Sequence, residues 1–93
     1  MYGRVVTYTF DEDRDALEAK ARAEVVPLVT GTPGYIAYGV MFTEDRVVSA
    51  SAWESEEHAK AGDAAILDWV QGTTMKVDQR FTGDLAWLEL AGR

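Results

Sequence analysis

The chain has 93 residues but no cysteine and a single histidine. Without cysteine it cannot form a disulfide, a thiolate metal site or a cysteine nucleophile, which suits a reducing compartment. No segment approaches the ~20 consecutive apolar residues that cross a bilayer, and the first ten residues lack the apolar core of a signal peptide. We therefore expect a soluble, uncleaved cytoplasmic protein without a membrane partner.

Positive charge is also scarce. Nine Lys and Arg stand against sixteen Asp and Glu, so the net charge is −7, and the bases are scattered along the chain. A surface of this kind repels polyanions. We expect no nucleic-acid partner.

What the chain does contain is apolar side chains, since 47% of its residues are hydrophobic and 11% are aromatic. This content argues against disorder, and the length suits one modest hydrophobic core. Hence we expect a single folded domain over residues 1–93.

Alternating β-branched and aromatic residues predict four strands, and apolar residues repeated every three or four positions predict two helices. Ser55 is a good N-cap for the second helix, and Pro33 and Gly34 suit the centre of a type II turn. The strands are expected at residues 4–10, 35–42, 47–53 and 75 to about 90, with a break or bulge at Gly83, and the helices from residue 13 to about 28 and from 55 to 70.

The order βαββαβ predicts a ferredoxin-like α+β sandwich, in which a four-stranded antiparallel sheet carries both helices on one face. The strand at residues 35–42 contains no charged residue and no Ser, Thr, Asn or Gln. Either register therefore leaves an apolar stripe on the face without helices. We expect a homodimer that packs sheet to sheet and buries at least ~1,000 Å². The two alternating sets of this strand are Tyr35, Ala37, Gly39 and Met41, and Ile36, Tyr38, Val40 and Phe42.

Three stretches carry a family resemblance: P-G-Y-I-A-Y at 33–38, V-V-S-A-S-A-W-E-S-E-E-H-A-K-A at 47–61 and D-W-V at 68–70. In a βαββαβ chain of this length they resemble the antibiotic biosynthesis monooxygenase-like family of dimeric α+β barrels. The resemblance implies that two sheets pack face to face to form a barrel. That family includes cofactor-free oxygenases of aromatic polyketides, haem-degrading oxygenases and members without known activity.

The resemblance does not extend to the haem-degrading branch. That branch has an asparagine on the first strand and a histidine ligand near the end of the second helix, whereas this chain has no asparagine and its His58 lies in the first turn. Asp11, Asp13 and Asp15 imitate the start of a calcium loop, but Ala16 stands where that loop needs glycine. We expect neither a metal nor another cofactor.

His58 lies among Glu54, Glu56 and Glu57. A lone histidine without a nucleophile or a ligand cluster is weak support for catalysis. We expect its side chain to point towards solvent, while Trp53 packs beneath the second helix.

A candidate ligand site comes from large aromatic side chains and one arginine, predicted on strands or on the inner face of the second helix. Such rings could stack on a flat ligand with a polar edge to orient it, although large aromatics in a small domain also serve as plain core. Asp78 and Arg80 are two apart in a strand, so we expect them on one face, as an ion pair with each other or with a neighbouring strand. The candidate substrate-binding residues are Tyr8, Tyr38, Trp53, Trp69, Arg80 and Phe81.

Two functions remain open. In the first, the protein is a small cofactor-independent monooxygenase of a phenolic or enolic aromatic molecule, in which the substrate loses a proton and the electron-rich anion reacts with oxygen itself. Tyr8, Tyr38 or Arg80 could take part in that proton transfer. In the second, the protein is a non-catalytic dimer that binds a small ligand or whose barrel is filled.

Overall fold

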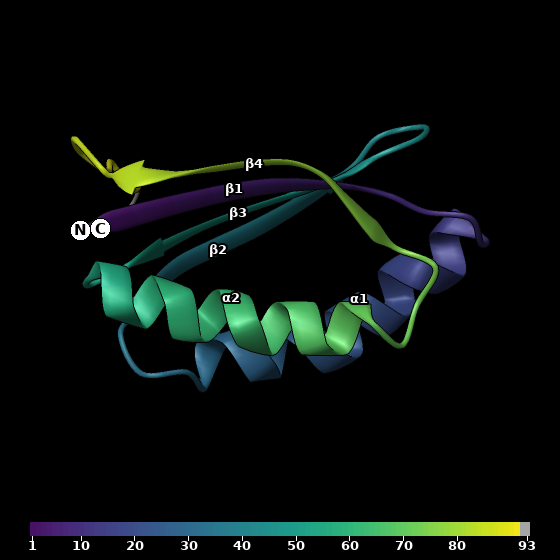
Figure 1. Cartoon of the computed structure of the whole chain (residues 1–93), viewed down its shortest axis with the longest axis horizontal. Coiled ribbons are helices and arrows are strands. Elements are labelled where there is room, and N and C mark those ends of the chain that lie inside the picture. Colours follow the sequence, from purple (N-terminus) through teal and green to yellow (C-terminus); the bar gives the residue numbers. More distant parts are fainter. Residues whose placement is uncertain (92–93) are drawn as a thin grey trace.

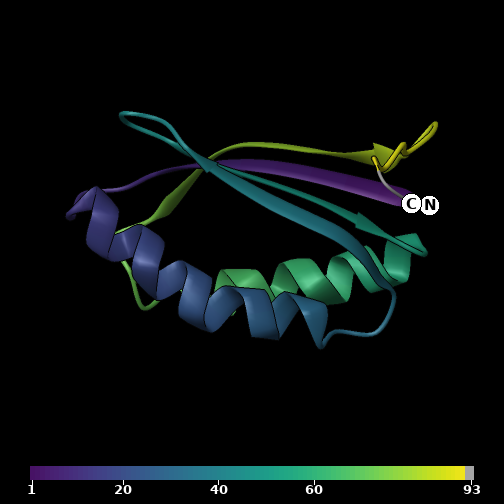
Figure 2. The same cartoon turned by 180° about the vertical axis from the view of Figure 1, so that it is seen from behind.

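The computed structural model describes residues 1–91 and confirms the order βαββαβ. The sheet has the strand order β2-β3-β1-β4 with antiparallel neighbours, and both helices cover the same face of it (Figures 1 and 2). The ferredoxin-like α+β sandwich is therefore confirmed. The elements are β1 (Tyr2–Thr9), α1 (Arg14–Thr30), β2 (Tyr35–Phe42), β3 (Val47–Trp53), α2 (Glu56–Val70) and β4 (Lys76–Asp84).

The register of the strands decides which side chains face the helices. Directly paired residues on neighbouring strands point to the same face of a sheet. The face without helices, called the open face below, carries the rows Ala37–Ala52–Gly3–Gly83 and Gly39–Ala50–Val5–Phe81. The helix-facing side carries the rows Tyr38–Ser51–Arg4–Thr82 and Val40–Ser49–Val6–Arg80. Small and apolar residues thus lie outside, and a set of polar groups lies under the helices.

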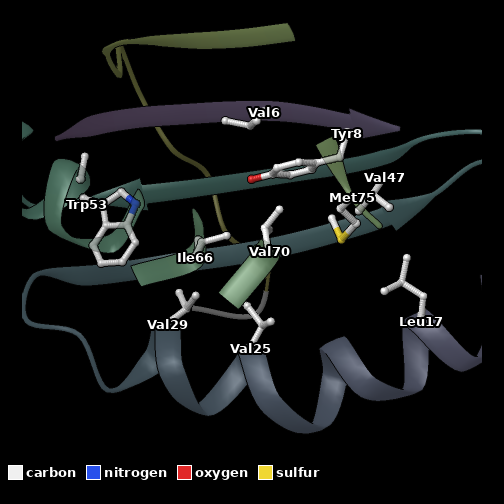
Figure 3. Packing of buried hydrophobic residues seen from close by; sticks show 11 residues of the cluster. Val6, Tyr8, Leu17, Val25, Val29, Val47, Trp53, Ile66, Val70 and Met75 are labelled. Atoms are coloured by element: carbon white, nitrogen blue, oxygen red, sulfur yellow. The ribbon is translucent and has the colours of Figure 1, made fainter. Parts of the chain in front are cut away.

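The core lies between the helix-facing side and the two helices (Figure 3). Trp53 is completely buried there, and its Nε1 donates a hydrogen bond to Ser51 Oγ at 2.9 Å. The indole packs against Gly62 of α2, where an added Cβ would lie 2.3 Å from its ring. This confirms the expectation that Trp53 packs beneath the second helix.

Ser55 is the N-cap of α2, and its hydroxyl accepts from the backbone N–H of His58. The His58 ring is half-buried, with Nδ1 at 2.8 Å from Ser55 Oγ. It lies against Gly34, whose φ of +83° confirms the glycine position of the turn. The prediction that His58 points towards solvent is wrong because the turn before β2 packs on the ring.

A bulge at Ile36 changes the expected alternation of β2. Tyr35 pairs with Trp53 while Ala37 pairs with Ala52, so two steps on β2 match one step on β3. Tyr35 therefore joins the helix-facing side, and its ring meets Trp53 edge to face at 6.3 Å between centroids. The open face receives Ala37, Gly39 and Met41 of the first predicted set.

The last strand differs most from its prediction. It ends at Asp84, and Gly83 pairs regularly with Gly3, so the expected bulge at Gly83 is wrong. The irregularity lies opposite Thr7 and Tyr8, and it turns Asp78 towards the open face. Asp78 accepts from Arg46 Nε at 3.1 Å, and Arg46 lies just before β3, so the ion pair of Asp78 is neither with Arg80 nor with the adjacent strand β1.

None of the described helices combines the length and the apolar character that a membrane span requires.

Candidate functional site

A small cavity of about 20 Å³ lies between the sheet and the helices. Four of its lining side chains carry polar atoms, from three elements on the helix-facing side and from the inner face of α2: Tyr8, Tyr38, Ser49 and Trp69. The rest of its wall is apolar, formed by Ala21, Val25, Val40, Phe42, Val47, Ile66, Val70 and Met75. The cavity is thus an apolar space with a few hydroxyl groups, as is common in sites for small aromatic molecules.

A wider groove of about 270 Å³ runs between α1 and the edge strand β2. The groove and the cavity share Ala21, Tyr38, Val40 and Phe42, so these side chains form the partition between them. A ligand that lies in the groove can reach the cavity by displacing the ring of Tyr38 or Phe42. The two spaces together offer the volume that the cavity lacks.

A hydrogen-bonded network reaches the cavity from the buried Arg4, which is 1% exposed. Its Nη2 donates to the hydroxyl of Tyr8 at 2.9 Å, and its Nη1 donates to Ser49 Oγ at 3.3 Å. Its Nε donates to the carboxylate of Asp63 on α2. The second oxygen of Asp63 accepts from Arg80 Nη1 at 2.5 Å.

Tyr38 lies at the partition and is largely buried. Burial raises the pKa of its phenol above the ordinary value of 10.0, while Ser49 acts in the opposite direction by hydrogen bonding. Tyr8 adds to the increase of this pKa and the charge of Arg4 reduces it. Tyr38 therefore remains a neutral phenol at neutral pH and can donate a proton into the cavity.

Trp69 is held at the junction of the two helices. Its Nε1 donates to Glu24 Oε1 of α1 at 2.8 Å, and Lys20 Nζ lies 5.8 Å from the centre of its ring. These contacts fix the indole so that part of it lines the cavity. The residue supplies a flat apolar wall.

The structure brings Tyr8, Tyr38 and Trp69 together and separates the other three candidate residues from them. Trp53 is core, and Arg80 reaches the network only through Asp63. Phe81 lies on the open face with 59% of its surface exposed. Arg80 and Phe81 are consecutive in β4, and consecutive residues of a strand point to opposite faces, so they cannot line one cavity.

Sequence reasoning missed Arg4, Ser49 and Asp63. A signal for the first two was present, because Arg4 alternates with Val6 and Tyr8, and Ser49 alternates with Ser51 and Trp53. Each set had to share one face of its strand with a residue expected in the core. Asp63 could not be found in this way, since its approach to Arg4 depends on how α2 packs on the sheet.

Within residues 1–91, no three His, Asp or Glu side chains gather as the ligands of a metal ion would. The polar groups at the cavity are hydroxyls backed by a guanidinium. Such groups bind and stabilise an oxygen atom that carries negative charge.

No protein-family profile matches the chain, and no curated protein matches it in sequence. Solved structures do match its fold. A provisionally named antibiotic biosynthesis monooxygenase from Chloroflexus aurantiacus shares 21% identity over 98% of both chains, with a TM-score of 0.73.

Two further solved structures are oxygenases of Streptomyces. The monooxygenase ActVA-Orf6 of Streptomyces coelicolor, in complex with nanaomycin D, is 18% identical over 98% of this chain and 92% of its own, with a TM-score of 0.69. SnoaB, a cofactor-independent oxygenase from Streptomyces nogalater, is 9% identical over 99% and 97%, with a TM-score of 0.71. At these identities the likeness establishes the fold. The resemblance to the antibiotic biosynthesis monooxygenase-like family is confirmed at that level.

Proposed function

We propose that the protein is a small cofactor-independent oxygenase of a phenolic or enolic aromatic molecule, which it binds between the sheet and the helices. The observation that carries this proposal is the side chain of Tyr8, which lines an apolar cavity while its hydroxyl accepts a hydrogen bond from the buried Arg4. The oxygenases among the solved structures of the same fold support it.

The chemistry needs no electron carrier when the substrate itself is the reductant. Loss of a proton from an activated CH₂ group gives an enolate or phenolate, whose carbon combines with O₂ and a proton to form a hydroperoxide. Loss of water then leaves a carbonyl group, so that one oxygen atom enters the product and the other leaves as water. The hydroxyls of Tyr8 and Ser49 stabilise the anion, and the neutral Tyr38 is a proton donor to the peroxide.

An oxygen electrode tests this proposal with chelator-treated protein and anthrone as the probe. We expect protein-dependent oxygen uptake that falls at least tenfold in Tyr8→Phe. Tyr35→Phe is the matched control, because Tyr35 also lies on the helix-facing side but contacts Trp53 rather than the cavity. Uptake no faster than in buffer, or an equal rate in Tyr8→Phe, would contradict the proposal.

The second candidate function is a non-catalytic domain that binds a small ligand. The small volume of the cavity, about 20 Å³, favours it, because an aromatic substrate cannot enter without movement of the partition. Binding of anthrone without oxygen uptake is the outcome that this alternative predicts.

We also propose that the protein acts as a homodimer joined through its open faces. This face holds a hollow of about 460 Å³ with a floor of small residues, namely Ala37, Gly39, Ala50 and Ala52. Phe81 of the edge strand β4 forms part of its wall, and the hollow extends to the opposite edge strand β2. A two-fold axis through the sheet would lay Phe81 of each copy over the hollow of the other, which gives a self-complementary interface.

Sedimentation equilibrium at micromolar concentration tests the homodimer. We expect twice the chain mass of 10.3 kDa for the wild type and the chain mass itself for Ala50→Arg, which puts a charge into the hollow. Leu28→Arg on α1 is the control, because Leu28 is an exposed apolar residue on the helical layer. A stable wild-type monomer would exclude the dimer.

A further inference from the structure

The network behind the cavity has more positive than negative charge. Arg4 and Arg80 share one carboxylate, that of Asp63. In the described residues 1–91, neither guanidinium forms an ion pair with a second acid. The three side chains therefore carry a formal charge of +1, beside a cavity in a chain whose net charge is −7. Arg4 has almost no contact with solvent that could screen it.

Two side chains with hydroxyl groups connect this charge to the cavity. Tyr8 and Ser49 each accept a hydrogen bond from Arg4 with their oxygen, and both line the cavity. Since the oxygen of Tyr8 is already an acceptor for the guanidinium, its own proton can be donated towards the cavity. The hydroxyl of Ser49 hydrogen-bonds the phenol of Tyr38, so its proton becomes available when a ligand displaces that ring. A hydroxyl that accepts from a cation is also a stronger donor, because the bonds polarise one another. Figure 3 shows the ring of Tyr8 between the sheet and the residues of α2.

We infer that the cavity selects the anionic form of a flat phenol or enol, whose oxygen is held by Tyr8 and Ser49, with Arg4 as the positioning residue behind both. This inference rests on the proposed site but not on oxygen chemistry. A network that merely joined α2 to the sheet would show no preference between a neutral and an ionised ligand. The preference is therefore the property to measure.

The expected size of the effect follows from the geometry. An opposite charge within about 4–6 Å lowers the pKa of an acid by about 1–3 units. Arg4 acts through an intervening hydroxyl, so we expect the low end of this range. Burial acts in the opposite direction, as it does for Tyr38, so the decrease of about one unit in the pKa of the bound phenol is expected relative to the same site without the network. One unit corresponds to about a tenfold gain in the binding of the phenolate relative to the phenol.

The probe is 4-nitrophenol, whose visible absorption reports its ionisation near neutral pH. Its spectrum is titrated with pH at saturating protein, and the pKa of the bound probe is compared between the wild type and the variants that lack the network. We expect a pKa about one unit lower in the wild type than in those variants, and the same low value in Arg46→Gln. Arg46→Gln is the matched control, because it removes a positive charge that lies outside both the cavity and the groove.

Three variants decide whether the network is responsible. Tyr8→Phe combined with Ser49→Ala leaves the ion pair of Arg4 and Asp63 in place and should abolish the shift. Arg4→Gln should abolish it too, whereas Arg4→Lys, which keeps the charge, should retain part of it. If Arg4→Gln does not fold, as circular dichroism will reveal, the double variant decides alone.

The inference is overturned by either of two results: no binding of 4-nitrophenol at millimolar concentration, or a pKa of the bound probe in the double variant equal to that in the wild type. Failure of the oxygenase proposal is a separate outcome. If the network lowers the pKa of the bound probe but anthrone causes no oxygen uptake, the anion site is supported and the oxygenase proposal fails. If oxygen is taken up with anthrone but that pKa is not lowered, the oxygenase proposal is supported and the anion site fails.

Discussion

Replacing Gly62 by alanine tests how α2 packs on the sheet, because α2 contacts Trp53 of the sheet at this glycine. The same packing holds the site together. An added Cβ would be 2.3 Å from both Cη2 and Cζ2 of Trp53, against about 3.5–4.0 Å for a normal carbon contact. The indole cannot easily retreat, since it is completely buried and its Nε1 is bonded to Ser51. Either the ring or the helix must move.

Two effects of opposite sign determine the result. Alanine is favoured over glycine inside a helix by about 1 kcal/mol. Overpacking in a filled core costs about 1–3 kcal/mol and sometimes more. The contact here is far inside the normal distance, so we expect the upper part of that range and a net loss of roughly 1–2 kcal/mol in the free energy of unfolding.

Urea denaturation followed by circular dichroism measures this loss, at a fixed protein concentration because dimerisation would contribute to stability. Ala64→Gly, at an exposed position of the same helix, measures the propensity effect alone and should lose about 1 kcal/mol. Trp53→Phe removes the edge of the indole that would clash with the new Cβ. In this background Gly62→Ala should therefore reduce the free energy of unfolding much less than it does in the wild type. A Gly62→Ala protein as stable as the wild type or more stable would refute the packing argument.

Three further predictions concern a turn, an acid-sensitive contact and the open face. Gly34→Ala should lose about 1–3 kcal/mol in urea denaturation, because φ is +83° and the new Cβ would lie 2.2 Å from His58 Cγ; an unchanged midpoint would contradict this. Hydrogen bonds from the side chain and backbone of Thr74 lower the pKa of Glu12 below 4.5, so its stabilisation is complete above that value and is lost as the pH falls through the lowered pKa. The melting temperature of Glu12→Gln should therefore depend less on pH in this acid range than that of the wild type. Thermal melts in which the two proteins show the same pH dependence would exclude the contact. Phe81→Ala should raise the dissociation constant of the homodimer about tenfold or more in sedimentation experiments, and an unaltered constant would remove Phe81 from the interface.

The element order could be predicted because local patterns decide it. β2 and β3 begin and end where the alternation of apolar residues and the turn residues put them, and Ser55 caps α2 as its side chain suggests. The end of β4 could not be predicted in this way, because the apolar segment beyond Asp84 continues the pattern of a strand without continuing its pairing.

Only part of the candidate site could be predicted from the sequence. Tyr8, Tyr38 and Trp69 were found because large aromatics with polar atoms are sparse and conspicuous. Arg4 was missed, because an arginine near a strand end is normally exposed and its burial depends on Asp63, which is 59 residues away in the chain. Contacts of this kind depend on the packing of a helix against a sheet, which periodicity does not determine.

The most direct test of the account is a crystal structure of the protein grown with 4-nitrophenol above the pKa of the probe. The account predicts its oxygen at hydrogen-bond distance, about 2.5–3.2 Å, from the hydroxyls of Tyr8 and Ser49, in a two-fold dimer joined through the open faces. A probe bound on the open face against Phe81, with the cavity around Tyr8 still closed, would contradict it.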